Sequence, residues 1–420
     1  MSVATDKTTN DNVMRDTILA GLANYIDSGS IVSGAAALTL WKGAYGLSDS
    51  LLGLIGAFSA NAISAGVGAL IGGILCDKFG RKRIYQYDML FYAFGMLWLI
   101  FASAPWMIIT GFVLVGLAVG ADIPASWSLI AEIAPKRERA KYSGVAQLLW
   151  YLGPVVVNAL ALLLAPQGIL GMQIIFGHLL VIALALTLLR SRMHESKYWT
   201  DAKAAPGSAE ASDWRQLFNW VNLKAMLFLA GMYGFWNLWA GTNGFFGTYI
   251  WETVGKQSRE MSIAMQMLNF GLGIFSILFI FMRYSDRVNQ RTMFLTSAIL
   301  LIVGMGMLAV LPLTLPVAIA HITIMSLASG FGAQSFFQLW SSEMFPTLLR
   351  STAQGMTFAV VRIGLGIFSF FVPMLTTFGF HTLAWILVGF LTASALVGWL
   401  GAPRNEGKSL EEIEAERATA

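Results

Sequence analysis

Three ionisable side chains fall in the middle of apolar segments, where a charge is costly. Asp27 lies about ten residues into one segment, Asp122 lies ten residues before Glu132, and Arg362 lies about ten residues into another. At a rise of about 1.5 Å per residue, each is about 15 Å along its helix, close to the midplane of a ~30 Å hydrocarbon layer. Charges at that depth normally face a wet cavity or one another.

This set of charges could bind a proton. Two aspartates and one arginine sum to −1 when all are ionised, and one proton makes the set neutral. Low dielectric disfavours an ionised carboxyl and a nearby arginine favours it, so two acids that share one arginine can differ in proton affinity. We predict that Asp27 or Asp122 is protonated from the outside and releases its proton inside. The alternative is a fixed pair of Arg362 with one aspartate that only holds two parts of the protein together.

Long apolar runs must position these residues. The chain of 420 residues is 56% hydrophobic and 12% charged, with a mean hydropathy of +0.66, whereas a soluble protein carries roughly 25% charged residues. A helix needs about 20 apolar residues to cross a bilayer. We therefore predict an all-α membrane protein with twelve transmembrane helices. The predicted spans are 17–41, 50–75, 85–104, 107–131, 141–165, 169–189, 222–250, 260–283, 292–311, 315–342, 352–375 and 379–401.

The second half of the chain repeats the first. At a constant offset of 211 positions, one set of residues recurs in the other half. The pairs are Glu132 and Glu343, Pro135 and Pro346, Arg139 and Arg350, Gly144 and Gly355, and Gly153 and Gly364. Such a duplication predicts two pseudo-symmetric six-helix bundles with a site near the midplane between them, which is a transporter architecture.

The polar segments divide the chain and set its orientation. We predict an N-terminal tail (1–16), a six-helix bundle (17–190), a linker (191–220), a second bundle (221–402) and a C-terminal tail (403–420). Lysine and arginine gather in the loops after even-numbered spans, so the positive-inside rule places both termini and the linker in the cytoplasm. The expected location is a cell membrane, namely a bacterial inner membrane.

The tails differ in expected structure. The N-terminal tail is expected to be disordered. Residues 405–418 are expected to form a short helix, with Ser409 as its N-cap and Glu411 and Glu412 in its first turn.

The loop after the second span carries a motif. It contains Gly73, Leu75, Asp77, Gly80, Arg81, Lys82 and Arg83. This loop matches the loop signature of the major facilitator superfamily, at the position which that family requires. The repeated Glu, Pro and Arg residues and the segments 194–199 and 403–411 resemble the sugar porter branch. The resemblance covers essentially the whole chain and implies the major facilitator fold.

The resemblance also implies a gate. Carboxylates and guanidiniums at the cytoplasmic helix ends would form ion pairs that close the inner mouth and break when the transporter opens inward. The gate residues so implied are Asp77, Arg81, Glu132, Arg139, Asp286, Arg287, Glu343 and Arg350. The alternative is that the cations only set the topology.

Residues 27–34 resemble the sugar porter segment whose aspartate takes up the coupling proton. The family pairs that aspartate with an arginine that follows a glycine in the fourth span, but here Gly111 is followed by Phe112. The fourth span instead offers Asp122 in a run that resembles phosphate:proton symporters of the superfamily. The resemblance thus implies Asp27 and Asp122 as proton-coupling residues.

Amides and aromatic rings form the expected substrate surface. Gln147 matches a sugar-hydroxyl ligand of the family, and Asn237 and Asn243 fall in its seventh-span amide motif. Amides donate and accept hydrogen bonds, which suits hydroxyl-rich solutes. The predicted substrate-binding residues are Gln147, Tyr151, Trp236, Asn237, Asn243, Gln334, Gln338 and Arg362. Most other aromatic residues are expected to pack helices or to lie at the lipid interface.

These features predict a secondary active transporter that takes up a small hydroxylated metabolite with protons by alternating access. A midplane arginine binds carboxylate or phosphate in fork geometry, so Arg362 favours a sugar acid or another organic anion over a plain sugar or polyol. A neutral substrate fits if an aspartate neutralises Arg362. The alternatives are a proton-linked exporter of sugars or drugs and a membrane solute sensor without transport.

An enzyme is the least expected class. The sequence has no Gly-x-x-x-x-Gly-Lys-Ser nucleotide loop, and its four histidines are too scattered for an obvious metal cluster. We therefore expect no cofactor and no metal. The expected partners are a small-molecule substrate, protons and the lipid bilayer, not nucleic acid, and the protein is expected to function as a monomer.

Overall fold

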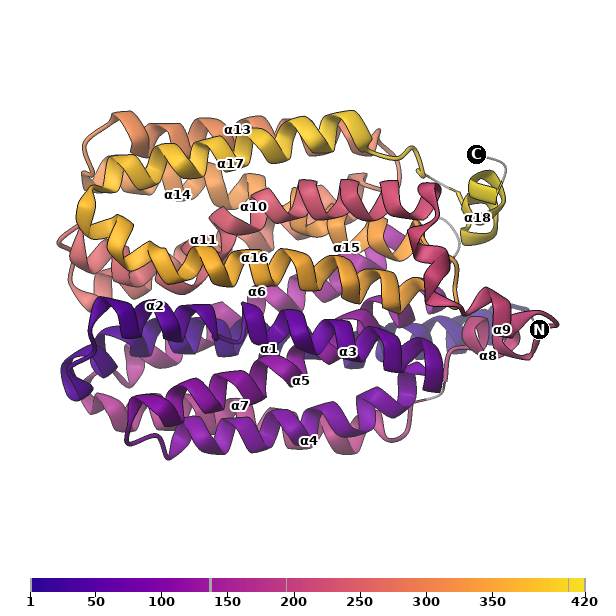
Figure 1. Cartoon of the computed structure of the whole chain (residues 1–420), viewed down its shortest axis with the longest axis horizontal. Coiled ribbons are helices and arrows are strands. Elements are labelled where there is room, and N and C mark those ends of the chain that lie inside the picture. The colour runs from indigo at the N-terminus through magenta and orange to yellow at the C-terminus, as the bar shows by residue number, and fades with distance from the viewer. Residues whose placement is uncertain (1, 136–137, 194, 407, 419–420) are drawn as a thin grey trace.

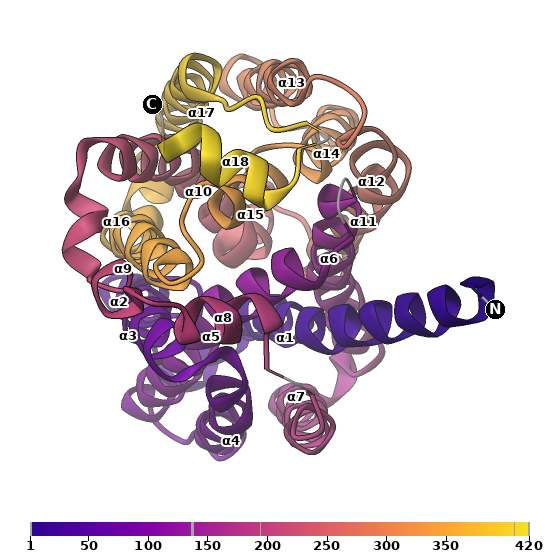
Figure 2. The same ribbon diagram turned by 90° about the vertical axis from the view of Figure 1, so that its right-hand side faces the viewer.

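The chain folds into long helices that run side by side, with both termini at the same end of the bundle (Figure 1). The computed structural model describes residues 2–135, 138–193, 195–406 and 408–418, and every regular element in that part is helical. We call the end that carries α8, α9 and α18 the termini end and the other end the opposite end. Figure 2, which looks at the termini end, shows the two halves of the chain as two groups of helices.

The first half of the chain forms seven α-helices and one short 3-10 turn. These are α1 (Ser2–Tyr45), α2 (Asp49–Ala57), α3 (Ile63–Phe79), α4 (Arg81–Ile100), α5 (Pro105–Ile133), α6 (Arg139–Leu163), η1 (Ala165–Gln167) and α7 (Ile169–Arg190). The linker contains α8 (Lys197–Ala204), α9 (Ser208–Ala211) and η2 (Trp214–Phe218).

The second half continues with α10 (Trp220–Thr253), α11 (Arg259–Ser276), the π-helical turn η3 (Ile277–Phe281), α12 (Met282–Tyr284), α13 (Gln290–Val310), α14 (Leu315–Gly330), α15 (Ala333–Glu343), α16 (Arg350–Phe378), α17 (Phe380–Gly401) and α18 (Leu410–Ala418). Here α11, η3 and α12 follow one another without a gap and make one crossing, and α14 and α15, which two residues separate, make another.

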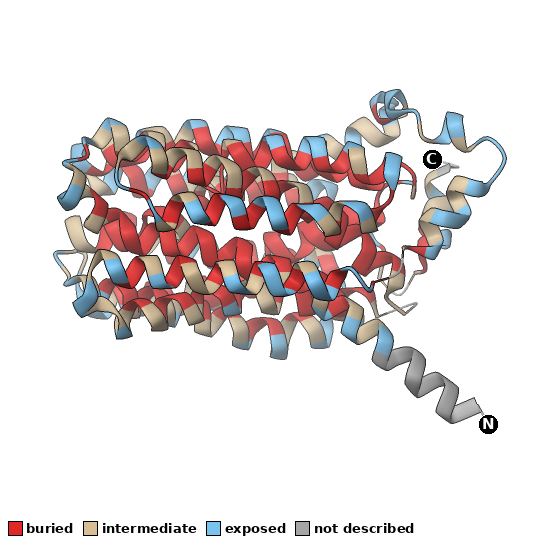
Figure 3. Cartoon of the chain, turned by 90° about the horizontal axis from the view of Figure 1, so that it is seen from below, coloured by how far each residue is buried: buried red, intermediate tan, exposed pale blue. Residues whose placement is uncertain are grey.

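Twelve membrane crossings result, as predicted. Within the described residues, eight helical stretches are long and apolar enough to cross a membrane by length and composition alone. The other four crossings are α1, α2 with α3, α4, and α10. Buried residues fill the interior of the bundle and exposed ones lie on its outside (Figure 3). Many of the exposed side chains are large and apolar, such as Val181, Leu188 and Val360, as expected for a surface that faces lipid.

Two crossings are broken where the sequence predicted continuous helices over 50–75 and 315–342. The first break covers residues 58–62, between α2 and α3, and the second covers Phe331 and Gly332, between α14 and α15. A broken helix inside a membrane must have its freed backbone groups satisfied by the protein. Arg362 does this at the first break, where it donates to the carbonyl oxygen of Asn61 at 2.9 Å.

The two bundles approach each other through small residues. A Cβ on Gly73 of α3 would lie 2.3 Å from the Ser351 carbonyl oxygen of α16, and one on Gly355 of α16 would lie 2.2 Å from the Ala69 carbonyl oxygen of α3. Glycine at these positions therefore lets two backbones touch across the bundle interface.

The structure of the two chain termini can be compared with the predictions made from the sequence. Ser409 and Glu412 form a capping box, since the Glu412 N–H donates to Ser409 Oγ at 3.2 Å and the Ser409 N–H donates to Glu412 Oε2 at 2.6 Å. The predicted C-terminal helix and its cap are thus confirmed, with α18 beginning at Leu410. The expectation of a disordered N-terminal tail is not borne out for residues 12–16, which belong to α1. Gly80, between α3 and α4, has a positive φ of 98°, a conformation that glycine adopts readily.

Candidate functional site

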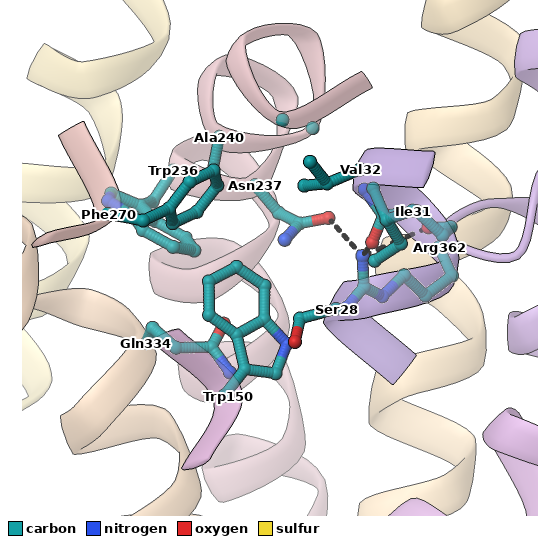
Figure 4. Close-up of a pocket in the computed structure, with 13 residues that line it drawn as sticks. Ser28, Ile31, Val32, Trp150, Trp236, Asn237, Ala240, Phe270, Gln334 and Arg362 are labelled. Atoms are coloured by element: carbon teal, nitrogen blue, oxygen red, sulfur yellow. Dashed lines mark hydrogen bonds between the residues drawn. The ribbon is translucent and has the colours of Figure 1, made fainter. Parts of the chain in front are cut away.

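A narrow cavity lies between the two bundles, about midway along them. The space open to water-sized molecules is only about 20 Å³, roughly the room that one water molecule needs. Its walls come from α1, α6, α10, α11, α15 and α16 and from the break between α2 and α3, so both halves of the chain contribute (Figure 4). The polar lining consists of Ser28, Asn61, Asn237, Gln334 and Arg362. The larger apolar side chains of the lining are Ile31, Val32, Trp150, Trp236 and Phe270.

Arg362 bridges the two halves at this cavity. Its Nη1 donates to the carbonyl oxygen and to Oδ1 of Asn61 on the N-terminal side, and lies 3.5 Å from Asn237 Oδ1 on α10. Its Nη2 lies 3.5 Å from the Tyr233 hydroxyl, and its guanidinium stands 4.4 Å above the Phe358 ring. The arginine is therefore held by amide and carbonyl oxygens and by an aromatic face rather than by a carboxylate.

Asp27 lies beside the cavity on α1. It is 4% exposed, and its Oδ2 accepts a hydrogen bond of 3.2 Å from the indole Nε1 of Trp150, whose ring lines the cavity. A single indole thus separates this carboxylate from the space where a ligand would lie. The neighbouring residue Ser28 reaches the cavity itself.

A second, similarly tight cavity, with about 40 Å³ open to water-sized molecules, adjoins the first, because both are lined by Trp150, Trp236 and Phe270. Among its walls are two predicted substrate residues, Tyr151 and Asn243. The structure therefore brings Tyr151, Trp236, Asn237, Asn243, Gln334 and Arg362 into one region between the bundles.

The two remaining predicted substrate ligands lie elsewhere. Gln147 of α6 donates a hydrogen bond through Nε2 to Gln338 Oε1 of α15, and both side chains are buried. They connect the bundles between the cavity and the termini end rather than line the cavity. Any contact of these amides with substrate thus stays a prediction that needs another conformation.

Asp122 does not join Asp27 and Arg362. It lies inside the N-terminal bundle, where both of its oxygens face Arg190, at 2.9 Å from Nη1 and 3.5 Å from Nη2. Arg190 lies one residue beyond the predicted span 169–189, but in the structure it is the last residue of α7 and is fully buried. The pairing of Asp122 with Arg190 depends on how α5 and α7 are placed in the fold, because the two residues are 68 positions apart in the sequence.

Ion pairs connect the bundles at the termini end. Glu132 Oε1 at the end of α5 receives Arg81 Nη2 at 2.9 Å and, from the other bundle, Arg350 Nη1 at 2.8 Å. Arg81 also lies 3.3 Å from Asp77. These side chains are almost completely buried, so one carboxylate neutralises guanidiniums from both halves.

The internal repeat relates the ion pair of Glu132 and Arg350 to a second pair, of Glu343 and Arg139, which also joins the two bundles. Arg139 Nε of α6 donates to Glu343 Oε1 of α15 at 3.0 Å, and its Nη2 donates to the Lys408 carbonyl oxygen at 2.6 Å. The Asn405 amide holds the second oxygen of Glu343 at 3.1 Å. The C-terminal tail therefore packs over the ion pairs.

Two aspartates bind helix N-termini across the interface. Asp77 accepts from the backbone N–H groups of residues 351 and 352 on α16 at 3.3 and 2.7 Å. Asp286, between α12 and α13, accepts from those of residues 140 and 141 on α6 at 3.1 Å each. Burial raises the pKa of Asp286, and the two N–H donors oppose this rise. Arg287, also predicted for the gate, is exposed.

The opposite end is also closed. The Thr248 hydroxyl of α10 donates to the Ala35 carbonyl oxygen of α1 at 3.2 Å, and Arg259 Nη2 of α11 donates to the Ala36 carbonyl oxygen at 3.1 Å. With contacts between the bundles on both sides of the cavity, the structure represents an occluded state.

Two pseudo-symmetric six-helix bundles, a polar cavity between them and ion pairs across one end are the features of a membrane transporter that works by alternating access. Residues 17–368 match the Major Facilitator Superfamily, and the chain belongs to this family. Its class is therefore a multi-pass transporter and not an enzyme.

The chain is also similar to individual transporters of known name. The chain is 46% identical to the minor myo-inositol transporter IolF of Bacillus subtilis strain 168, over 95% of this chain and 93% of that protein. It is 25% identical to the cis,cis-muconate transport protein of Acinetobacter baylyi, over 89% and 90% of the two chains. The proton:xylose symporter XylE bound to 6-bromo-6-deoxy-D-glucose has the same fold, with a TM-score of 0.83 at 17% identity over 97% of this chain and 99% of that one.

Proposed function

We propose that this protein is a proton-coupled transporter that takes up a cyclic polyol, with myo-inositol as the first candidate, or a related sugar. The observation that carries the proposal is the 46% identity to a myo-inositol transporter over 95% of the chain. The cavity supports it, because its amides and serine can bond hydroxyl groups and its indole rings can cover the apolar faces of a ring-shaped solute.

In the proposed mechanism, substrate hydroxyls bond Asn237, Gln334 and Ser28, while Trp150 and Trp236 pack against the carbon skeleton. The narrow cavity must widen to admit a solute of this size, so binding belongs to a state in which one end is open. The ion pairs of Glu132 and Glu343 act as the gate at the termini end. The positive-inside rule assigns that end, with both termini, to the cytoplasm of a bacterial inner membrane.

Proton coupling is part of the same proposal. Asp27 lies beside the cavity, and its carboxyl accepts a hydrogen bond from the Trp150 indole, which also lines the substrate space. A change in its charge would therefore alter the hydrogen bond that positions Trp150. This gives a direct physical connection between a proton and the substrate.

A second substrate class is a carboxylated metabolite, such as a sugar acid. Arg362 favours it, because this buried guanidinium is bonded to neutral oxygens and faces the cavity. A substrate carboxylate could replace Asn61 as the partner in fork geometry. Competition of labelled myo-inositol uptake by a neutral polyol and by a sugar acid separates the two classes.

The test uses the purified full chain in proteoliposomes. We expect labelled myo-inositol to accumulate when a proton gradient is imposed, and to exchange in counterflow when none is. Loss of accumulation in Asp27→Asn, with counterflow retained, would support the coupling role. Counterflow without proton-driven accumulation by the wild type would refute coupling, and no counterflow with any polyol or sugar would refute the carrier itself in favour of a sensor.

A further inference from the structure

A second group of charged side chains lies inside the N-terminal bundle, apart from the central cavity. Nη1 of Arg190 on α7 lies 2.9 Å from Asp122 Oδ1 on α5 and 3.9 Å from Asp88 Oδ2 on α4. Two carboxylates therefore approach one guanidinium nitrogen. Arg190, Asp122 and Asp88 are 0%, 2% and 6% exposed, so water screens these charges little.

Asp88 is the unsatisfied member of this group. Its Oδ1 accepts a hydrogen bond of 2.6 Å from the Met89 N–H, but its buried Oδ2 has no hydrogen-bond partner. Asp122, in contrast, contacts Arg190 through both of its oxygens. A buried carboxylate oxygen without a donor is costly, whereas a protonated carboxyl supplies its own donor.

The net charge of this group of side chains favours the binding of one proton. Two carboxylates and one guanidinium sum to −1, and a single shared proton makes the group neutral. The nearest other titratable groups are Tyr85 of α4, whose ring lies 4.7 Å from the Arg190 guanidinium, and Cys76 of α3. Both are neutral as an ordinary phenol and thiol, so neither cancels the remaining negative charge.

We propose that Asp88 and Asp122 share one proton beside Arg190, and that this pair is a proton-binding site of the transport cycle. The inference rests on the proton coupling proposed above and assigns that coupling a second location within the N-terminal bundle. Asp122 enters it through its bond to Arg190, and Asp88 enters it as the carboxyl that gains and loses the proton.

Asp88 lies at the floor of a mostly apolar groove on the outside of the bundle. The groove runs between α3, α4 and α5. Along α4 the polar lining residues are Arg83, in the first turn at the termini end, then Tyr87 and Asp88. Asp88 stands seven residues after Arg81, the first residue of α4, which places it about 10 Å from the termini end, the side we assign to the cytoplasm.

Arg190 connects the site to the cavity through α1. Its Nε donates to the Leu19 carbonyl oxygen at 3.0 Å and its Nη2 donates to the Ala20 carbonyl oxygen at 2.8 Å. The same helix carries Asp27 and Ser28 about two turns further on. An ionised Asp88 competes with these carbonyls for the guanidinium, so its protonation state changes how firmly Arg190 holds the helix that lines the cavity.

The experiment compares proton-driven accumulation of labelled myo-inositol with counterflow at equal pH in proteoliposomes. Asp88→Asn leaves Arg190 with one carboxylate, a neutral set that needs no proton. We expect at least ten-fold lower accumulation than in the wild type, with counterflow still measurable. Asp122→Asn gives the same charge and should give the same split. Asp201→Asn, an exposed carboxylate on α8, is the matched control and should behave as the wild type.

Accumulation by Asp88→Asn at the wild-type level would overturn the inference and leave the proposed function intact. If the wild type shows no proton-driven accumulation, both the inference and the proposed proton coupling are overturned. The measurement on the wild type alone distinguishes this outcome from the previous one. If the asparagine variants do not fold, Asp88→Glu keeps a titratable carboxyl and should accumulate myo-inositol with a shifted pH profile. A profile that coincides with the wild type would then refute the site.

Discussion

At the scale of single residues, the important outcome is how the buried charges are paired. Asp27 lies next to a cavity indole, Asp122 pairs with Arg190 inside one bundle, and Arg362 spans both bundles. Each charge is costly in a membrane unless a partner satisfies it. Their different partners fit the proposal that separate groups bind the substrate and the protons.

Arg362→Gln tests the substrate side. The change removes the guanidinium that contacts Asn237, a proposed ligand of the polyol, so the KM for myo-inositol should rise about ten-fold, the equivalent of losing about 1.5 kcal/mol of one hydrogen bond to a charged group. Initial uptake rates over a range of concentrations measure this. The preference for neutral polyols over sugar acids should be unchanged if the substrate is neutral. An unaltered KM would show that Arg362 serves only to hold Asn61.

At the scale of helices, close backbone contacts decide how the bundles meet. The contact of α3 with α16 depends on Gly73 and Gly355, where a Cβ would overlap a carbonyl oxygen of the other helix. The break between α2 and α3 lies in the same crossing and places Asn61 opposite Arg362. Helix α16 thus contacts the N-terminal bundle and also carries the cavity arginine.

Gly355→Ala should destabilise the occluded state. Its Cβ would lie 2.2 Å from the Ala69 carbonyl oxygen, and overpacking of this kind costs about 1–3 kcal/mol. A lower midpoint of thermal unfolding in detergent, together with slower transport, is the expected result. Gly364→Ala on the same helix is the control, because its Cβ would meet no atom within 4 Å. Equal midpoints for the two variants would contradict the close contact.

At the scale of the whole molecule, both ends are closed around the cavity. Glu132 bonds Arg81 and Arg350 at one end, while α10 and α11 donate to α1 carbonyls at the other. Alternating access requires each set of contacts to break in turn. The balance between them sets which side is open.

Glu132→Gln should shift that balance. The neutral amide leaves two buried guanidiniums without their shared carboxylate, which costs about 3–5 kcal/mol for a buried pair. The termini end should therefore open more often. Spin labels at the exposed residues Arg83 and Arg287, one on each bundle, should report a longer distance distribution than in the unsubstituted labelled protein. An unchanged distribution would show that these ion pairs do not act as a gate.

Much of the fold follows from the sequence. The lengths of the apolar runs and the constant 211-residue offset predict twelve crossings in two bundles, because both properties are read along the chain. The N-cap formed by Ser409 could also be predicted, because Ser409 and its hydrogen-bond partner Glu412 are only three residues apart in the sequence. Of the three residues placed near the midplane by helix rise, Asp27 and Arg362 lie at the central cavity, whereas Asp122 lies inside the N-terminal bundle.

Only the tertiary structure decided which charges meet. The partners of Asp122, of Arg190 and of Arg362 come from helices far away in the sequence, and helix packing alone fixes their distances. The breaks at residues 58–62 and 331–332 likewise depend on long-range contacts, since Arg362 satisfies Asn61 from 301 positions away. A hydrophobic run determines that a helix crosses the membrane, but its neighbours determine where it bends and which side chain its charges reach.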